Sequence, residues 1–298
     1  RRNYILDRMA EAGFASKEEA GAAKNTAIAA VPLRQGLIAP HFVMYVREYL
    51  QEKYGESAVE QSGFKVITTL DVDMQNAAEK IIKDGAEFNE KQAGAANAAM
   101  VAINPETGDI IAMAGSADYW SKPKPDGCKP GVNCRLDPHV NIATRSRQPG
   151  SSFKPFVYAA AFKKGFTPET VLFDVFTEFN TYCNADGTPG PSATSETHCY
   201  HPQDYDGTFR GPVSLRQALA QSLNVPAVKL LYLAGIKDSI TTAQSMGIST
   251  LTDPDRYGLS LVLGGAEVTL LDMTSAYGVF AQDGVLHQKS AVLRIESA

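Results

Sequence analysis

The sequence has 298 residues, of which 44% are hydrophobic, and its formal net charge at neutral pH is −5. A chain of this length and composition is expected to form about two domains with sizeable cores. The weak charge and the lack of any basic run exclude a typical nucleic-acid-binding surface, and no stretch reaches the ~18 consecutive apolar residues of a membrane span.

The beginning of the chain is predicted to be mainly helical. Ser16 and Glu19 have the spacing of a capping box, which marks a helix start, and residues 40–54 have the pattern of an amphipathic helix. A strand is predicted near residues 64–70, and Asp71 is placed to cap the helix that follows.

A second domain is predicted to start where this helix ends. We assign residues 1–94 to an N-terminal helical region with a linker, and residues 95–298 to the second domain. That domain opens with a hairpin over residues 101–113, whose turn lies at residues 104–108. Helix-rich sequence follows the hairpin, so the predicted fold class is α+β, a sheet with packed helices and an added helical subdomain.

The pattern Ser-x-x-Lys occurs three times, and it matters because a lysine amine one helical turn along can take a proton from a serine hydroxyl. The match at Ser62 runs into the predicted strand, where residues three apart point to opposite faces. The match at Ser121 lies among prolines, outside any helix. Only Ser151 and Lys154 open a helical pattern, which apolar residues continue to residue 161.

A serine at a helix start is well placed for nucleophilic catalysis. Unpaired amides and the positive end of the helix dipole favour an alkoxide or oxyanion at Ser151. The same field and burial are expected to lower the pKa of Lys154 and make its neutral amine accessible. Pro155 is tolerated only in a first turn, so the regular helix is predicted to begin near Ser151 or Ser152. The alternative is an ordinary N-cap serine followed by a surface lysine.

Four cysteines bracket two turn-rich loops, as Cys128 with Cys134 and Cys183 with Cys199. Three pairings are possible, and pairing of neighbours is the simplest. Disulfides would fit an oxidising, extracytoplasmic space. Zinc is the alternative, supported by two histidines close to Cys199, but no Cys-x-x-Cys pair occurs. We therefore predict no metal site and no cofactor.

A second polar motif, Ser222-Leu223-Asn224, is the only Ser-x-Asn in the chain and follows a helical run over residues 213–221. On a short turn both side chains can face one cleft, where Ser222 can relay protons and Asn224 can hold a substrate amide. An ordinary polar helix end is the alternative. Tyr182-Cys183-Asn184 is a weaker rival for the same role, because a glycine- and proline-rich loop follows it.

Together these motifs resemble the class A penicillin-binding proteins, the bifunctional peptidoglycan synthases. The likeness covers nearly the whole chain and includes several ordered segments. Residues 1–9 resemble the end of the family's glycosyltransferase domain, 66–71 its linker, 101–113 the opening hairpin of its transpeptidase domain, 205–213 the approach to the second motif, and 263–277 the segment after it.

The resemblance implies a partial fold of the transpeptidase and serine beta-lactamase type, and it implies roles for four residues. Ser151 would be the acylated nucleophile, with its backbone amide in the oxyanion hole, Lys154 its base, and Ser222 and Asn224 the second motif. The family cleaves the terminal D-Ala-D-Ala bond of a peptidoglycan stem peptide and passes the acyl group to an amine. Beta-lactams mimic the donor. The resemblance also implies a parent protein with an N-terminal membrane anchor and an extracytoplasmic location.

Two departures from the family pattern lead to further expectations. The third motif, Lys-Thr-Gly or Lys-Ser-Gly on a strand, is absent, and the nearest candidate, Lys289-Ser290-Ala291, lacks the glycine. Residues 292–295 read as a strand cut short, so these 298 residues alone are expected to acylate poorly. The glycosyltransferase catalytic region is also absent. The alternatives are a serine beta-lactamase, a beta-lactam sensor and a non-catalytic cell-wall scaffold.

Overall fold

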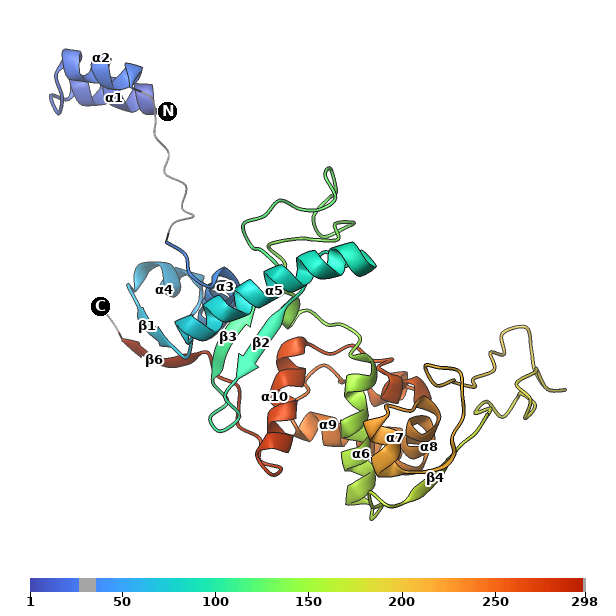
Figure 1. The fold of residues 1–298 in the computed structure, drawn as a ribbon. Coiled ribbons are helices and arrows are strands. Elements are labelled where there is room, and N and C mark those ends of the chain that lie inside the picture. The colour runs from blue at the N-terminus through green and yellow to red at the C-terminus, as the bar shows by residue number, and fades with distance from the viewer. Residues whose placement is uncertain (27–35, 297–298) are drawn as a thin grey trace. The chain divides into compact units, whose positions relative to one another are not determined.

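The computed structural model describes residues 1–26 and 36–296, which fall into two compact units, Arg1–Ile38 and Ala39–Ala298 (Figure 1). The first unit is a pair of helices, α1 (Arg2–Glu11) and α2 (Lys17–Asn25). The Arg2 guanidinium donates hydrogen bonds to the carbonyl groups of Lys24 and Thr26 at the end of α2. The predicted capping box of Ser16 and Glu19 is confirmed at the start of α2.

The second unit begins with α3 (Pro40–Tyr54), α4 (Glu56–Gln61) and β1 (Lys65–Thr68). The bounds of α3 are those predicted, since Pro40 starts the helix in its first turn and Gly55 ends it. Strand β1 pairs antiparallel with β6 (Val292–Glu296), near the other end of the chain. The pairing joins the predicted linker to the predicted second domain, and the boundary after residue 94 stays a prediction.

The predicted hairpin is confirmed as β2 (Met100–Ile103) and β3 (Ile110–Ala114). Helix α5 (Val72–Ala93), which Asp71 caps as predicted, lies along this hairpin (Figure 1). The fully buried Gln75 fixes the contact, because its side chain accepts a hydrogen bond from the Met113 amide at 2.8 Å and donates one to the Met113 carbonyl at 3.1 Å.

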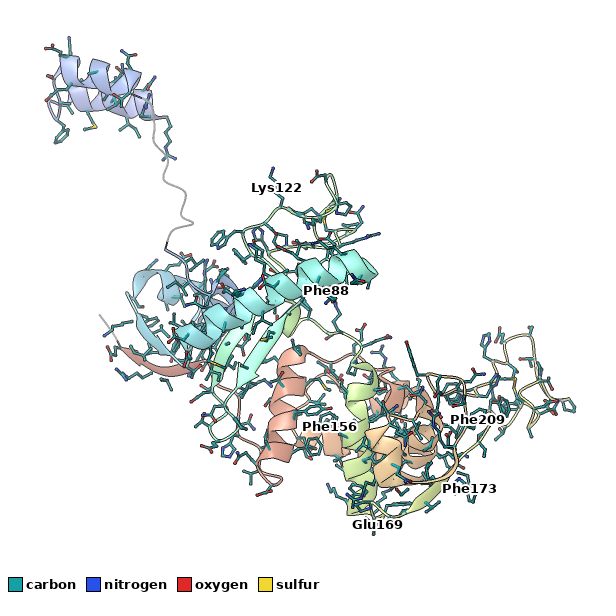
Figure 2. The ribbon with its side chains drawn as sticks, viewed as in Figure 1. Phe88, Lys122, Phe156, Glu169, Phe173 and Phe209 are labelled. Atoms are coloured by element: carbon teal, nitrogen blue, oxygen red, sulfur yellow. A yellow bond between two sulfur atoms is a disulfide. The ribbon has the colours of Figure 1, made fainter. Side chains whose placement is uncertain are left out.

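The largest core lies in the helical part of this unit. At its centre is α6 (Lys154–Lys163), where Phe156 packs against two aromatic rings of α10 (Leu270–Ala281) (Figure 2). The other elements are η2 (Ile142–Thr144), η3 (Gly150–Phe153), β4 (Val171–Asp174), β5 (Gly211–Ser214), α7 (Leu215–Ala220), α8 (Asn224–Ala234), α9 (Ile236–Ser245), η4 (Pro254–Arg256) and η5 (Leu259–Leu263). Small antiparallel sheets with packed helices confirm the predicted α+β class.

Both cysteine pairs form disulfides between neighbours, Cys128 with Cys134 and Cys183 with Cys199, which is the simplest of the three pairings that the sequence left open. Each disulfide closes a largely exposed loop. Among the helices of the described residues, none combines the length and the hydropathy needed to cross a membrane.

Candidate active site

Lys154, the first residue of α6, is buried, with only 1% of its surface exposed. Its Nζ donates hydrogen bonds to the Ser222 carbonyl at 2.6 Å, to Ser222 Oγ at 3.2 Å and to Asn224 Oδ1 at 2.8 Å. The three acceptors match the three protons of an ammonium group. The fold thus brings together three of the four predicted site residues.

Ser151 lies in η3, the 3-10 turn that precedes α6, and is exposed. The prediction that the regular helix begins near Ser151 or Ser152 is wrong, since α6 begins at Lys154. In an α-helix the Ser151 carbonyl would accept a hydrogen bond from residue 155, but Pro155 has no N–H. The Lys154 amide donates to that carbonyl instead, which closes a tighter turn.

The Ser151 hydroxyl and the Lys154 amine lie on consecutive turns but are not hydrogen-bonded to each other within the described residues. The exposed hydroxyl is open to a substrate, while the amine is held by the second motif. Catalytic hydrogen bonds are often formed only when substrate is bound. This arrangement places an exposed hydroxyl and a buried amine on consecutive turns, where a bound substrate can bring them into line.

Burial lowers the pKa of Lys154 to about 8, and the negative charge of Asp204 opposes this shift. Taking an ammonium group out of water disfavours its charged form, which explains the direction. A neutral amine is therefore accessible near neutral pH, as predicted from the sequence. The pKa is close to that of an effective general base.

The second motif lies between two helices, and its geometry is tightly constrained. Ser222 has a φ of +55°, a left-handed conformation that costs a non-glycine residue about 1–2 kcal/mol. Asn224 begins α8 and donates its side-chain amide to the Gln203 carbonyl at 2.8 Å, which turns its Oδ1 toward Lys154. The backbone amide of Asn224 donates to Asp204, a buried residue that sequence reasoning did not single out.

The turn that presents Ser151 rests on the glycine that follows η5. Gly264 has a φ of +85°, and a Cβ there would overlap the backbone N and Cα of Gly150. Tyr277 of α10 donates its hydroxyl to the Ser152 carbonyl of the same turn at 2.8 Å. The position of Ser151 thus depends on two residues far along the chain.

We expect Gly264→Ala to lower the acylation rate at least about tenfold, because displacing a reacting group by about 1 Å can cost a hundredfold. The left-handed φ adds about 1–2 kcal/mol of destabilisation. Gly284→Ala is the matched control, since Gly284 has a φ of +95° but open space at its Cβ position. Equal acylation by the two variants would show that the contact with Gly150 does not position Ser151.

The nearest candidate for the third motif and the rival Tyr-x-Asn triplet lie in other surroundings. Lys289 donates its amine to Asp272 Oδ1 of α10 at 2.7 Å, and Ala291 is buried in the core beneath α3. In the rival Tyr-x-Asn triplet, Asn184 donates to Thr188 Oγ1 at 3.0 Å within its own loop. Neither feature contacts Lys154 in the described part of the chain.

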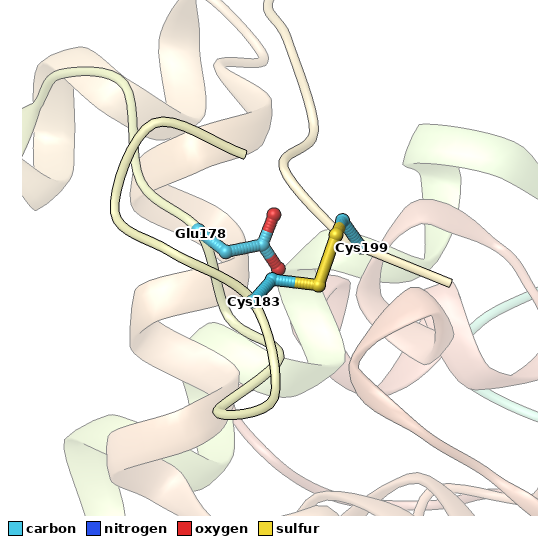
Figure 3. Close-up of side chains that lie close together, drawn as sticks. All are labelled: Glu178, Cys183 and Cys199. Carbon is cyan, nitrogen blue, oxygen red and sulfur yellow. A yellow bond between two sulfur atoms is a disulfide. The ribbon is translucent and has the colours of Figure 1, made fainter. Parts of the chain in front are cut away.

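Glu178 lies next to the Cys183–Cys199 disulfide (Figure 3). Its Oε1 accepts backbone hydrogen bonds from Asn180 and Tyr200, both at 2.7 Å. With both sulfurs in a disulfide, this trio contains no thiolate ligand. The geometry therefore fits a structural link between the two ends of the loop, and the absence of a metal site stays a prediction.

Comparison with known proteins gives consistent results. Residues 98–297 match the family description "Penicillin binding protein transpeptidase domain". The chain is 31% identical to penicillin-binding protein 2D of Bacillus subtilis, over 87% of this chain and 33% of that protein. It is 26% identical to penicillin-binding protein 1A of Pseudomonas aeruginosa, over 100% of this chain and 45% of that protein.

Among solved structures, penicillin-binding protein 1A from Haemophilus influenzae is similar, with a TM-score of 0.72 and 23% identity. The alignment covers 99% of this chain and 54% of that one, and it shows a shared fold. The chain spans between a third and a half of the length of the two curated relatives.

Proposed function

The chain belongs to the family of penicillin-binding protein transpeptidase domains, of the class A type, and from this premise we propose that it is a peptidoglycan D,D-transpeptidase that acts through a serine acyl-enzyme. The main supporting observation is the buried Lys154 amine, bound to Ser222 and Asn224 and lying one turn beyond the exposed Ser151.

In the first half of the proposed reaction, neutral Lys154 takes the proton of Ser151 Oγ, which attacks the carbonyl carbon of the penultimate D-alanine. The peptide C–N bond breaks, and the terminal D-alanine leaves with a proton that Ser222 relays from Lys154. An ester on Ser151 remains. The Ser151 backbone amide stabilises the oxyanion in this step, and Asn224 orients the substrate amide.

In the second half, an amine from a neighbouring stem peptide attacks the ester carbonyl. The amine loses one proton, which returns through Lys154 to Ser151 Oγ as the C–O bond breaks. The product is a cross-linked peptide and the free serine. Beta-lactams would acylate Ser151 in the same way, because their strained amide takes the place of the donor bond.

The proposal extends to the parent protein, which we infer to be a bifunctional synthase with a glycosyltransferase domain and a single N-terminal membrane anchor. Its transpeptidase domain would lie on the extracytoplasmic side of the membrane. Support comes from the class A relatives and from the two disulfides, which are typical of oxidising compartments.

We expect residues 1–298 alone to acylate slowly, because no Lys-Thr-Gly motif occurs in them and Lys289 is bound to Asp272. Stopped-flow labelling with a fluorescent penicillin measures this rate. Rapid stoichiometric labelling of this segment would contradict the expectation.

The proposed reaction is tested with the protein as it is naturally expressed, a stem pentapeptide ending in D-Ala-D-Ala, and an amine acceptor. We expect release of D-alanine together with an acceptor-linked product. Penicillin hydrolysis without action on the pentapeptide would instead favour a beta-lactamase. No reaction with either compound would favour the scaffold alternative.

A further inference from the structure

Two buried carboxyl groups lie beside the second motif. Asp174 ends β4 and is fully buried, and Asp204, in the loop before β5, is 5% exposed. Strands β4 and β5 pair so that Asp174 lies opposite Gly211. Phe173 and Phe209, labelled in Figure 2, mark this part of the molecule.

Each carboxyl group has one oxygen with a hydrogen-bond partner and one without. Asp174 Oδ2 accepts from the Arg210 amide at 2.8 Å, and Asp204 Oδ1 accepts from the Asn224 amide. Asp174 Oδ1 and Asp204 Oδ2 are buried and have no partner among the described residues. Both carboxyl groups lie against Arg210, whose backbone amide donates to Asp174 and whose Nη1 is 3.7 Å from Asp204 Oδ2. A hydrogen bond between the two carboxyl groups is among the causes that raise the pKa of Asp174, but two carboxylates can only accept.

We propose that Asp174 and Asp204 share one proton, which Asp174 holds and donates to Asp204, and that Asp174 thereby acts as a positioning residue for Asn224 and Lys154. A single O–H bond on Asp174 Oδ1 gives both unpartnered oxygens a hydrogen bond. It also removes the repulsion between two adjacent buried carboxylates, which disfavours ionisation of both. The catalytic consequence rests on the proposed function, whereas the shared proton does not.

The surrounding cations do not replace this proton. The Arg210 Nη1 lies 3.7 Å from Asp204 Oδ2, beyond hydrogen-bonding distance. The same guanidinium is bound to Asp206 through two hydrogen bonds, of 3.0 and 2.7 Å. Lys154 acts on Asp204 through its charge, but its amine donates to the second motif instead.

The proton is assigned to Asp174 by its surroundings. Burial and the hydrogen bond with Asp204 raise the pKa of Asp174, and the Arg210 amide and charge oppose this only in part. The nearby Lys229 donates its amine to the Phe173 carbonyl at 2.6 Å and interacts with Asp174 only through its charge. In the proposal Asp204 is therefore the acceptor of the pair, and it is the partner whose charge acts on Lys154.

This arrangement has two effects on the active site. Asp204 holds the first amide of α8, where a negative charge is favourable, and so fixes the backbone of Asn224. Its charge also opposes the lowering of the Lys154 pKa. Asp174 contacts no reacting group and acts through Asp204.

The shared proton is tested by infrared difference spectroscopy of the whole protein at neutral pH. Wild type minus Asp174→Asn is expected to show the C=O band of a protonated carboxylic acid, shifted in deuterated water. The same band is expected in wild type minus Asp204→Asn, because either change removes the repulsion that holds the proton. The exposed Asp126 gives the control variant Asp126→Asn. This variant should retain the protonated carboxylic acid, so wild type minus Asp126→Asn should not show its band. A wild-type protein without such a band would overturn the proposal.

The positioning role is tested by comparing two replacements of Asp174. Asparagine donates an N–H to Asp204 and should keep the acylation rate within about threefold, whereas leucine has no donor and should lower it at least about tenfold. Equal rates for the two variants would overturn the positioning role. If the leucine variant does not fold, Asp204→Asn tests the positioning role instead. Loss of the negative charge of Asp204 should lower the midpoint of the pH dependence of the acylation rate by at least about half a unit. An unchanged midpoint would also overturn the role.

These outcomes are separable from the proposed function. A carboxylic acid band in a protein that does not react with penicillin would leave the proton pair standing and remove the transpeptidase assignment. Acylation by penicillin in a protein without the carboxylic acid band would leave the transpeptidase assignment standing and remove the proton pair.

Discussion

Ser151→Ala should abolish covalent labelling by penicillin while leaving the thermal unfolding temperature nearly unchanged. The ester needs the Oγ atom of Ser151, which an alanine side chain lacks. The fold should tolerate the change, because Ser151 is exposed and its hydroxyl makes no hydrogen bond in the described structure. Gel fluorescence with a labelled penicillin and a thermal melt measure the two properties.

Ser152→Ala is the matched control. Ser152 is the next residue, is also exposed, and donates its hydroxyl to the Pro149 carbonyl at 2.6 Å. It should keep labelling and lose at most about 1 kcal/mol of stability. Persistent labelling of Ser151→Ala, or its loss in Ser152→Ala alone, would show that the nucleophile is misassigned.

Replacement of Lys154 should have the second largest effect. In Lys154→Met the side-chain volume is nearly kept but the base is gone, so acylation should fall by about 10²–10⁴-fold. The variant should also lose about 1–3 kcal/mol of stability, because buried acceptors on Ser222 and Asn224 lose their donor. Stopped-flow acylation and chemical denaturation measure these effects.

Lys154→Arg separates charge from basicity. A guanidinium group keeps the positive charge and can donate hydrogen bonds, but it does not give up its proton near neutral pH. We therefore expect acylation as low as in Lys154→Met. Substantial activity in the arginine variant would contradict the role of Lys154 as the base.

The pH dependence follows from the pKa of Lys154, which burial lowers to about 8. The active form is the neutral amine, so the acylation rate should rise with pH and level off above about 8. In the folded state Lys154 binds its proton less tightly than in the unfolded chain. Its contribution to stability should therefore increase as pH rises from about 8 toward 10.5. A rate that is flat from pH 6 to 9 would exclude this lysine as the base.

Local sequence patterns predicted much of the fold and the position of Ser151 just before Lys154, whereas the role of Ser151 as nucleophile stays a prediction. Residues 40–54 and Asp71 could be placed because apolar periodicity and capping chemistry act over a few residues. Ser151 and Lys154 were recognisable since the Ser-x-x-Lys spacing coincides with a helix start. The 3-10 turn was not predicted, although Pro155 cannot donate the hydrogen bond that would extend the regular helix back to Ser151.

Features that depend on long-range contacts could not be predicted in the same way. Asp174 and Asp204 lie in segments without a motif, and only the pairing of β4 with β5 and the burial of the loop bring them together. Nothing in the local sequence distinguishes Gly264 from other glycines, because its close contact with Gly150 arises only in the folded chain. The left-handed Ser222 is also unexpected, because local preference disfavours that conformation for serine.

The central claim is that Ser151 is the residue acylated in this site. Its most direct test is intact mass measurement and peptide mapping of the naturally expressed protein after exposure to penicillin. We predict one adduct per chain, confined to the peptide that contains Ser151. An adduct on another residue, or no adduct at all, would contradict the account and leave the non-catalytic scaffold as the better interpretation.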